Sequence, residues 1–233
     1  MVLVHGGAGP ELTWERQEEL GEQFSLVIPW RRGYPPNPSV DRQDFSADAE
    51  DLLGLANDGA HLVGFSYGGL GAAVAAEQAP ERFASLTLIE TPLWHAGAGD
   101  PEVDHLVALA ARFAAAVDAG EEPPTEFLQL ADMAPRTSPR GDAERERILA
   151  ITRGMRSPAE ARVDLPAVGS AMPALVLSGG HSSGLERLCD LTAEQLEAER
   201  AVLTGAGHAV PRADGFNALL AEFATAAEGS RSA

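Results

Sequence analysis

The sequence predicts an α/β protein, built on a mostly parallel, doubly wound sheet with helices on both faces. Short apolar runs alternate with helical stretches of ten or more residues, which is the pattern of a parallel sheet covered on both sides. One of these runs enters a glycine-rich turn that leads directly into a helix of small residues. From residue 93 to residue 168, by contrast, only helical patterns recur.

Each expected strand is a short run that is apolar almost throughout. The expected strands cover residues 1–4, 25–29, a run ending at 62–63, 85–89, 174–178 and 200–203. Helices are expected where apolar residues recur at helical spacing: a first one containing Leu12, Leu20 and Phe24, then 45–56, 69–78, 103–117, 185–196 and 215–226. We therefore expect a core formed by residues 1–92 and 169–233, interrupted by a helical insertion at 93–168.

Composition limits the classes of partner. A chain of 233 residues can bury one large core, and its net charge of −18 argues against nucleic acid or an anionic membrane as a partner. Cys189 is the only cysteine, so no internal disulfide forms, and we expect the reducing cytoplasm as its compartment. No apolar run is long enough to span a membrane, and no signal peptide is recognisable. A small molecule is the expected partner, and a homodimer is left open.

The glycine-rich turn carries the strongest motif. Residues 64–68 read Gly-Phe-Ser-Tyr-Gly and fit the G-x-S-x-G pattern, which is a weak signal alone in a chain with 24 glycines. Its position between a strand and a helix makes it meaningful, because such a turn exposes the serine above the strand ends in a strained backbone. The alternative is an ordinary glycine turn. We predict that Ser66 is a nucleophile.

Four segments together resemble the α/β-hydrolase fold superfamily: His5-Gly6-Gly7, Arg32-Gly33-Tyr34, the turn around Ser66, and Gly207-His208 after the last expected strand. The resemblance implies a serine hydrolase whose insertion at 93–168 is a helical cap. Members usually carry an N-terminal β-hairpin before the His-Gly loop, and this sequence lacks it. The fold hosts many reactions, so the resemblance does not name the substrate.

The resemblance also implies how a reaction would be assisted. His208 is the expected base for Ser66, because a serine hydroxyl needs a proton acceptor to become nucleophilic. The backbone N–H groups of Gly7 and Tyr67 are the expected oxyanion hole. A phosphate-binding loop is the alternative for residues 5–9, but the G-x-G-x-x-G pattern is not met. His5 is interpreted as a structural hydrogen-bonding residue.

The acid of the triad is less clear from the sequence. Members of the superfamily usually place it in the loop after the penultimate strand, here residues 179–184, which contains no carboxylate. Glu90 is the preferred candidate, because it ends the strand after the nucleophile helix, where certain haloalkane dehalogenases place their acid. Glu186 is the second candidate, and both satisfy the order serine, acid, histidine. A third possibility is that no acid is present.

The expected function is hydrolysis of a carboxylic ester, lactone or thioester of a small apolar molecule through an acyl-enzyme on Ser66. Neither a cofactor nor a metal is expected, since the histidines and carboxylates show no ligand spacing. A C–C hydrolase, lyase or cyclase is an alternative, as is a non-catalytic ligand-binding protein on the same fold. The residues expected to line the substrate pocket are Trp30, Tyr34, Trp94 and His95.

Overall fold

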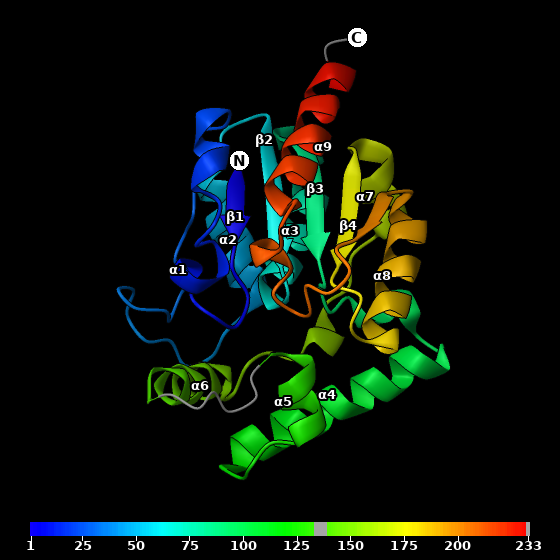
Figure 1. Cartoon of the computed structure of the whole chain (residues 1–233). Helices are drawn as coiled ribbons and strands as arrows, with labels where there is room; N and C mark the ends of the chain where they lie inside the picture. The colour runs from blue at the N-terminus through cyan, green and yellow to red at the C-terminus, as the bar shows by residue number, and fades with distance from the viewer. Residues whose placement is uncertain (133–138, 232–233) are drawn as a thin grey trace.

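A parallel sheet of five strands forms the centre of the computed structural model, which describes residues 1–132 and 139–231 (Figure 1). The strands are β1 (Val2–Val4), β2 (Ala60–Phe65), β3 (Phe83–Ile89), β4 (Ala174–Ser178) and β5 (Glu199–Val202), and they lie side by side in this order. Every neighbouring pair is parallel. The carboxyl ends of all five strands therefore meet at one edge of the sheet.

The predicted strand at 25–29 is reduced to a single β-bridge between Val27 and Val2. The bridge places Val27 beside β1. The N–H of Leu3 donates to the carbonyl of Val27, and the N–H of Val27 donates to the carbonyl of Met1, each at 2.9 Å. Pro29 has no N–H with which to continue the ladder. The chain steps outward from β1 to Val27 and returns across it to β2, so the strand order reverses here, as in a doubly wound sheet.

Helices cover both faces of the sheet, as predicted, because side chains along each strand point alternately to either side. One face packs on α2 (Phe45–Leu55), α3 (Tyr67–Gln78), α7 (Leu165–Ala171) and α8 (Ser183–Leu196). The other face packs on α9 (Phe216–Arg231). In β2, for example, Leu62 faces the first layer and Val63 the second.

The helix predicted around Leu12, Leu20 and Phe24 is wrong as a single element. The structure has a short α1 (Pro10–Thr13) and a separate 3₁₀ turn η1 (Glu18–Glu22). The large apolar residues of this stretch lie at positions 12, 14, 20 and 24, and this spacing does not form a continuous helical stripe. Leu20 is buried in the core beside α9, whereas Leu12 lines a cavity near the carboxyl edge of the sheet.

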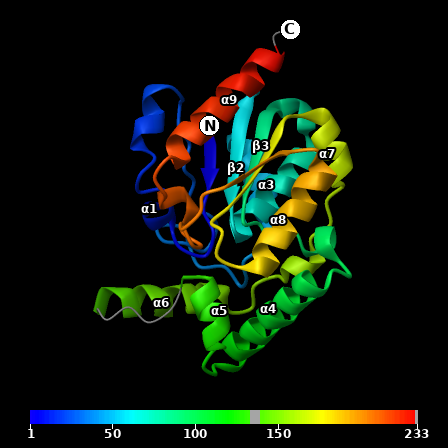
Figure 2. The same ribbon diagram turned by 45° about the vertical axis from the view of Figure 1, so that its right-hand side comes forward.

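A helical insertion between β3 and β4 lies beyond the carboxyl edge of the sheet (Figures 1 and 2). It contains α4 (Pro101–Ala119), α5 (Thr125–Leu130) and α6 (Pro139–Thr152), with the 3₁₀ turns η3 (Trp94–Gly97) and η4 (Pro158–Glu160). Asp100 caps the start of α4, and Gly120 ends it in a left-handed conformation. α4 packs on α5, α6 and the core helix α8.

Two short 3₁₀ turns and the helix α7 complete the described core. The 3₁₀ turns η2 (Pro80–Arg82) and η5 (Val210–Arg212) precede β3 and α9. α7 packs against α3 and α8, so the predicted end of the insertion at residue 168 falls inside a helix that belongs to the core layer. None of the helices at 1–132 and 139–231 combines the length and apolar character needed to cross a bilayer.

Candidate active site

Ser66 stands at a sharp turn between β2 and α3. Its backbone has φ 50° and ψ −129°, a strained conformation for a residue with a side chain, and its N–H donates to the carbonyl of Ile89 at 2.8 Å. The flanking glycines are required by close packing. A Cβ on Gly64 would lie 2.5 Å from the Cα of Gly69, and one on Gly68 would lie 2.2 Å from the carbonyl oxygen of His5. The turn thus has the geometry of a nucleophile elbow.

Glu90 and His208 are joined by a short hydrogen bond, in which Nδ1 of His208 lies 2.5 Å from Oε2 of Glu90. Glu90 directly follows β3 with a φ of 44°, and it is 2% exposed. The N–H of Gly179 donates to its other oxygen, Oε1, at 2.8 Å. Because a carboxylate only accepts, Nδ1 of His208 carries the proton, and Nε2 of the neutral ring keeps a lone pair.

A single cavity of about 600 Å³ connects these groups. Ser66, Glu90 and His208 all border it, although no hydrogen bond joins Ser66 to His208 among the described residues. Such bonds are often long before substrate binds. The remaining wall is largely apolar, and about half of its residues come from the insertion, including Trp94, Leu106, Phe113, Phe127, Ile148 and Met155. A cavity of this size and character suits a small apolar ligand.

Two buried side chains, Arg31 and Tyr34, hold the loop that carries Gly7. The carbonyl of Gly6 accepts hydrogen bonds from Nη1 of Arg31 at 3.0 Å and from the hydroxyl of Tyr34 at 3.1 Å. In a trans peptide the N–H points opposite to the carbonyl, so the N–H of Gly7 points away from these buried donors. Tyr67 opens α3, where the first N–H groups have no partner within the helix. Both residues line the cavity.

Arg31, which donates to this loop, also forms a buried ion pair that the sequence did not predict. Arg31 pairs with Asp48 at 2.8 Å, and both side chains are 3% exposed. Burial raises the pKa of Asp48, and the Arg31 guanidinium opposes that shift. Arg31 therefore supports the loop from a buried position, whereas Arg32 pairs with Asp51 on the surface.

His5 is structural in this arrangement. Its Nδ1 donates to the carbonyl of Ala8 at 2.8 Å, and its Nε2 accepts from the N–H of Arg31 at 3.1 Å. One donor and one acceptor define a neutral ring. Burial, reinforced by the charge of Arg31, lowers the pKa of His5 to about 3.

Of the four residues expected in the pocket, Tyr34 and Trp94 line the cavity. Trp30 and His95 are not among its lining residues. Nε2 of His95 lies 3.0 Å from the carbonyl of Val163, which it can only approach as a donor. Trp30 lies beside Gly9, where an added Cβ would be 3.5 Å from its ring. All four residues lie near the motifs in the sequence, but this nearness did not show which of them line the cavity.

Glu186 contacts other partners than His208. It accepts from the N–H of Gly180 at 2.9 Å, the hydroxyl of Ser178 at 2.6 Å and the guanidinium of Arg200 at 2.7 Å. These bonds anchor the start of the loop at 179–184. Of the two carboxylates considered from the sequence, only Glu90 contacts His208.

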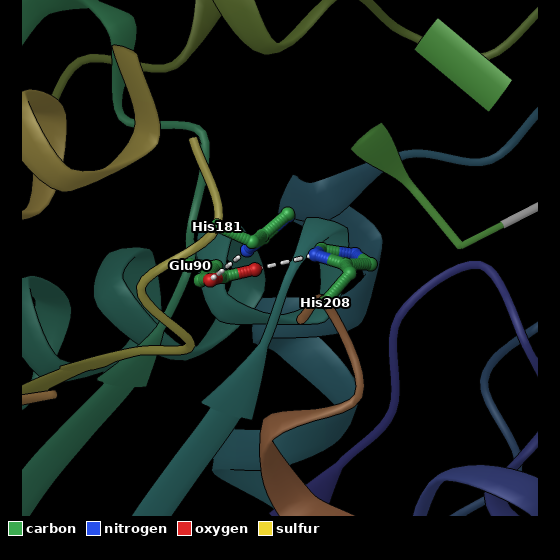
Figure 3. A group of neighbouring side chains, drawn as sticks. All are labelled: Glu90, His181 and His208. Atoms are coloured by element: carbon green, nitrogen blue, oxygen red, sulfur yellow. Dashed lines mark hydrogen bonds and ion pairs between the residues drawn. The ribbon is translucent and has the colours of Figure 1, made fainter. Parts of the chain in front are cut away.

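His181 is the residue that sequence reasoning missed. Its Nδ1 lies 3.4 Å from Oε1 of Glu90, so the carboxylate lies between His181 and His208 (Figure 3). Its Nε2 lies 3.0 Å from the carbonyl of Leu130, at the end of α5 in the insertion. The only available signal was its place in the loop where an acid was expected.

Comparisons with known proteins agree with the fold. A model of the alpha/beta hydrolase family matches residues 1–219. A structure from a study of carboxylesterases of the thaumarchaeon Nitrososphaera gargenis has 19% identity and a TM-score of 0.71, covering 98% of this chain and 90% of that one. A 2-hydroxy-6-oxo-6-phenylhexa-2,4-dienoate hydrolase from Rhodococcus sp. strain RHA1 has 23% identity and a TM-score of 0.66, covering 95% and 89%.

MenH from S. aureus is similar at 15% identity with a TM-score of 0.70, covering 97% of this chain and 93% of that one. A comparison with curated protein sequences found no match. Identities this low show the shared fold, whereas the family model spans nearly the whole chain. The chain therefore belongs to the alpha/beta hydrolase family and is a hydrolase.

Proposed function

We propose that this hydrolase cleaves a carboxylic ester, lactone or thioester of a small, largely apolar molecule through an acyl-enzyme on Ser66. The observation that carries the proposal is the short hydrogen bond from His208 to buried Glu90 beside the cavity that Ser66 borders. A serine, a histidine with a free Nε2 and an acid that orients the ring are the components of a hydrolytic triad.

In the first half of the reaction, Nε2 of His208 accepts the proton of the Ser66 hydroxyl while Oγ attacks the substrate carbonyl carbon. The N–H groups of Gly7 and Tyr67 donate to the oxyanion that forms. The resulting imidazolium is stabilised by Glu90 and gives its proton to the departing alcohol or thiol. Ser66 is left acylated.

In the second half, His208 accepts a proton from water, and the hydroxide attacks the acyl carbonyl. Collapse of this intermediate breaks the bond to Oγ, and the proton on His208 returns to Ser66. The acid product and the free enzyme result, so atoms and charge balance over the cycle.

The cavity supports an apolar acyl group or leaving group. In the insertion, the rings of Phe113 and Phe127 stack with their centroids 4.1 Å apart, and both residues line the cavity together with Leu106 and Ile148. A volume of about 600 Å³ is in the range of sites for small organic ligands. The C–C hydrolase, lyase or cyclase alternative uses the same site, so the products formed from a candidate substrate separate it from ester hydrolysis.

Intact-mass spectrometry after treatment with a fluorophosphonate tests the proposal. The wild type should gain one adduct, Ser66→Ala should gain none, and Ser170→Ala, which removes an exposed serine of α7, should label like the wild type. p-Nitrophenyl esters of increasing acyl length would then map the preference of the cavity. Folded wild type without an adduct would refute the acyl-enzyme and favour the lyase or the non-catalytic ligand-binding alternative.

A further inference from the structure

Three potential metal ligands meet at the edge of the cavity. Glu90 follows β3, His181 belongs to the loop after β4, and His208 belongs to the loop after β5 (Figure 3). One ligand atom from each, a carboxylate oxygen and two ring nitrogens, lies within 4.8 Å of the others. These positions are far apart in the chain, so no ligand spacing was visible in the sequence.

A neutral His181 presents the lone pair of Nδ1, which a cation could bind. The carbonyl of Leu130, 3.0 Å from Nε2, can only accept, so Nε2 carries the proton of the neutral ring. Nδ1 then directs a lone pair at Oε1 of Glu90, 3.4 Å away, which is also an acceptor and already receives the N–H of Gly179. In the neutral ring, two acceptors therefore face each other without a proton between them, whereas a doubly protonated ring would donate to Glu90 as an ion pair.

The same arrangement is the one that metal-binding histidines adopt. Such a histidine usually donates its second N–H to a carbonyl or carboxylate, which fixes the tautomer and the direction of the ligating nitrogen. His181 makes this outer bond to Leu130. In a tetrahedral zinc site with bonds of 2.0–2.1 Å, neighbouring ligand atoms lie about 3.3 Å apart, close to the separation between His181 and Glu90.

We propose that Glu90, His181 and His208 form an inhibitory Zn²⁺ site. Two imidazoles and one carboxylate are a common donor set for zinc, with water in the fourth position. A surface hollow lined by Glu126, Asp132, His181 and His208 gives access from the solvent, and its carboxylates attract a cation.

Inhibition follows from the tautomer of His208 and rests on the proposed function of that residue. Zinc would take Nδ1, so the ring proton moves to Nε2, and no net proton is released from a neutral ring. Nε2 then has no lone pair with which to accept the proton of Ser66. Zinc would also occupy Glu90, which could no longer orient the imidazole.

Isothermal titration of Ser66→Ala with ZnCl₂ tests the site itself, because this variant keeps all three ligands whether or not the protein is a serine hydrolase. We expect one Zn²⁺ per chain. Adding His181→Gln, which keeps an N–H at the position of Nε2 for Leu130 but removes the ligating nitrogen, should weaken binding at least about tenfold. The matched control His105→Gln, at an exposed histidine of α4, should leave binding unchanged.

The functional arm measures the rate of fluorophosphonate labelling with and without ZnCl₂ and after addition of EDTA. The zinc-to-untreated ratio should fall for the wild type, recover with EDTA, and fall much less for His181→Gln. Lack of binding to Ser66→Ala, or equal binding after His181→Gln, would overturn the site. If the wild type never labels, the proposed function fails, but the titration still decides the zinc site.

Discussion

Replacement of Glu90 by glutamine should slow the acylation of Ser66 by about 10³- to 10⁴-fold, equivalent to about 4–5.5 kcal/mol of transition-state stabilisation. The structure determines how the amide must sit. The N–H of Gly179 donates to Oε1 of Glu90, so the amide oxygen of the variant must occupy that position. Its NH₂ group then faces Nδ1 of His208.

The consequence is that His208 takes the opposite tautomer. Nδ1 of His208 must accept from the amide, so the ring proton is forced onto Nε2, where it blocks proton transfer from Ser66. If the amide turns the other way, its NH₂ meets the N–H of Gly179, and a buried donor loses its acceptor at a cost of about 1–3 kcal/mol. In that second orientation the amide oxygen accepts from Nδ1–H and the native tautomer is kept, so the variant reacts only after the amide has turned at this cost, and without the carboxylate charge that stabilises the imidazolium.

The assay is the second-order rate constant of fluorophosphonate labelling, with thermal unfolding as the check that the variant is folded. Glu186→Gln is the matched control, because that carboxylate contacts Gly180, Ser178 and Arg200 instead of His208. It should lose less than about tenfold. A Glu90→Gln protein that labels within tenfold of the wild type would refute the reasoning, as would equal losses in the two variants.

Three further predictions concern the same region. The pKa of His5 is about 3 when folded and about 6.5 when unfolded, so the unfolded chain binds more protons between these values and stability falls as pH falls. By this residue alone the free energy of unfolding should be about 2 kcal/mol lower at pH 5 than at pH 8, and urea titrations of His5→Asn should lack that part of the dependence. Gly68→Ala should destabilise the protein by several kcal/mol in the same titrations, because the new Cβ would meet the carbonyl of His5 at 2.2 Å, and a loss under about 1 kcal/mol would contradict that packing. Adding His181→Asp to Glu90→Gln should recover labelling at least about tenfold, since the two side chains face each other; a double variant no faster than the single one would show that the acid cannot be moved.

Local features were predictable from the sequence because neighbouring residues determine them. The turn at Ser66 follows from an apolar strand, two glycines and a helix of small residues, and Gly68 packs against His5 of another recognisable motif. The strand at 25–29 failed for the opposite reason. Only a three-residue partner, β1, is available to it, so its apolar composition could not extend the pairing beyond Val27.

The long-range contacts could not be predicted in the same way. Arg31 and Asp48 lie in a loop and a helix that both look solvated, yet they form a buried pair under the loop of Gly7. Removing one partner of such a pair would leave an uncompensated buried charge. Nothing in local hydropathy distinguishes Arg31 from Arg32, whose side chain is 46% exposed.

The register of the sheet explains why the acid was ambiguous in the sequence. β3 and β4 are neighbours with Ile89 paired to Leu177, so the residues after each strand emerge side by side, and the N–H of Glu90 donates to Leu177 at 3.0 Å. A carboxylate in either loop can therefore reach the same nitrogen of a histidine that follows β5. In this chain the carboxylate follows β3, and the loop after β4 contributes His181 against its other oxygen. Because a carboxylate has two oxygens and a triad uses one, the second oxygen, which accepts the N–H of Gly179, has a further lone pair for another ligand, and this is the chemical origin of the zinc site proposed above.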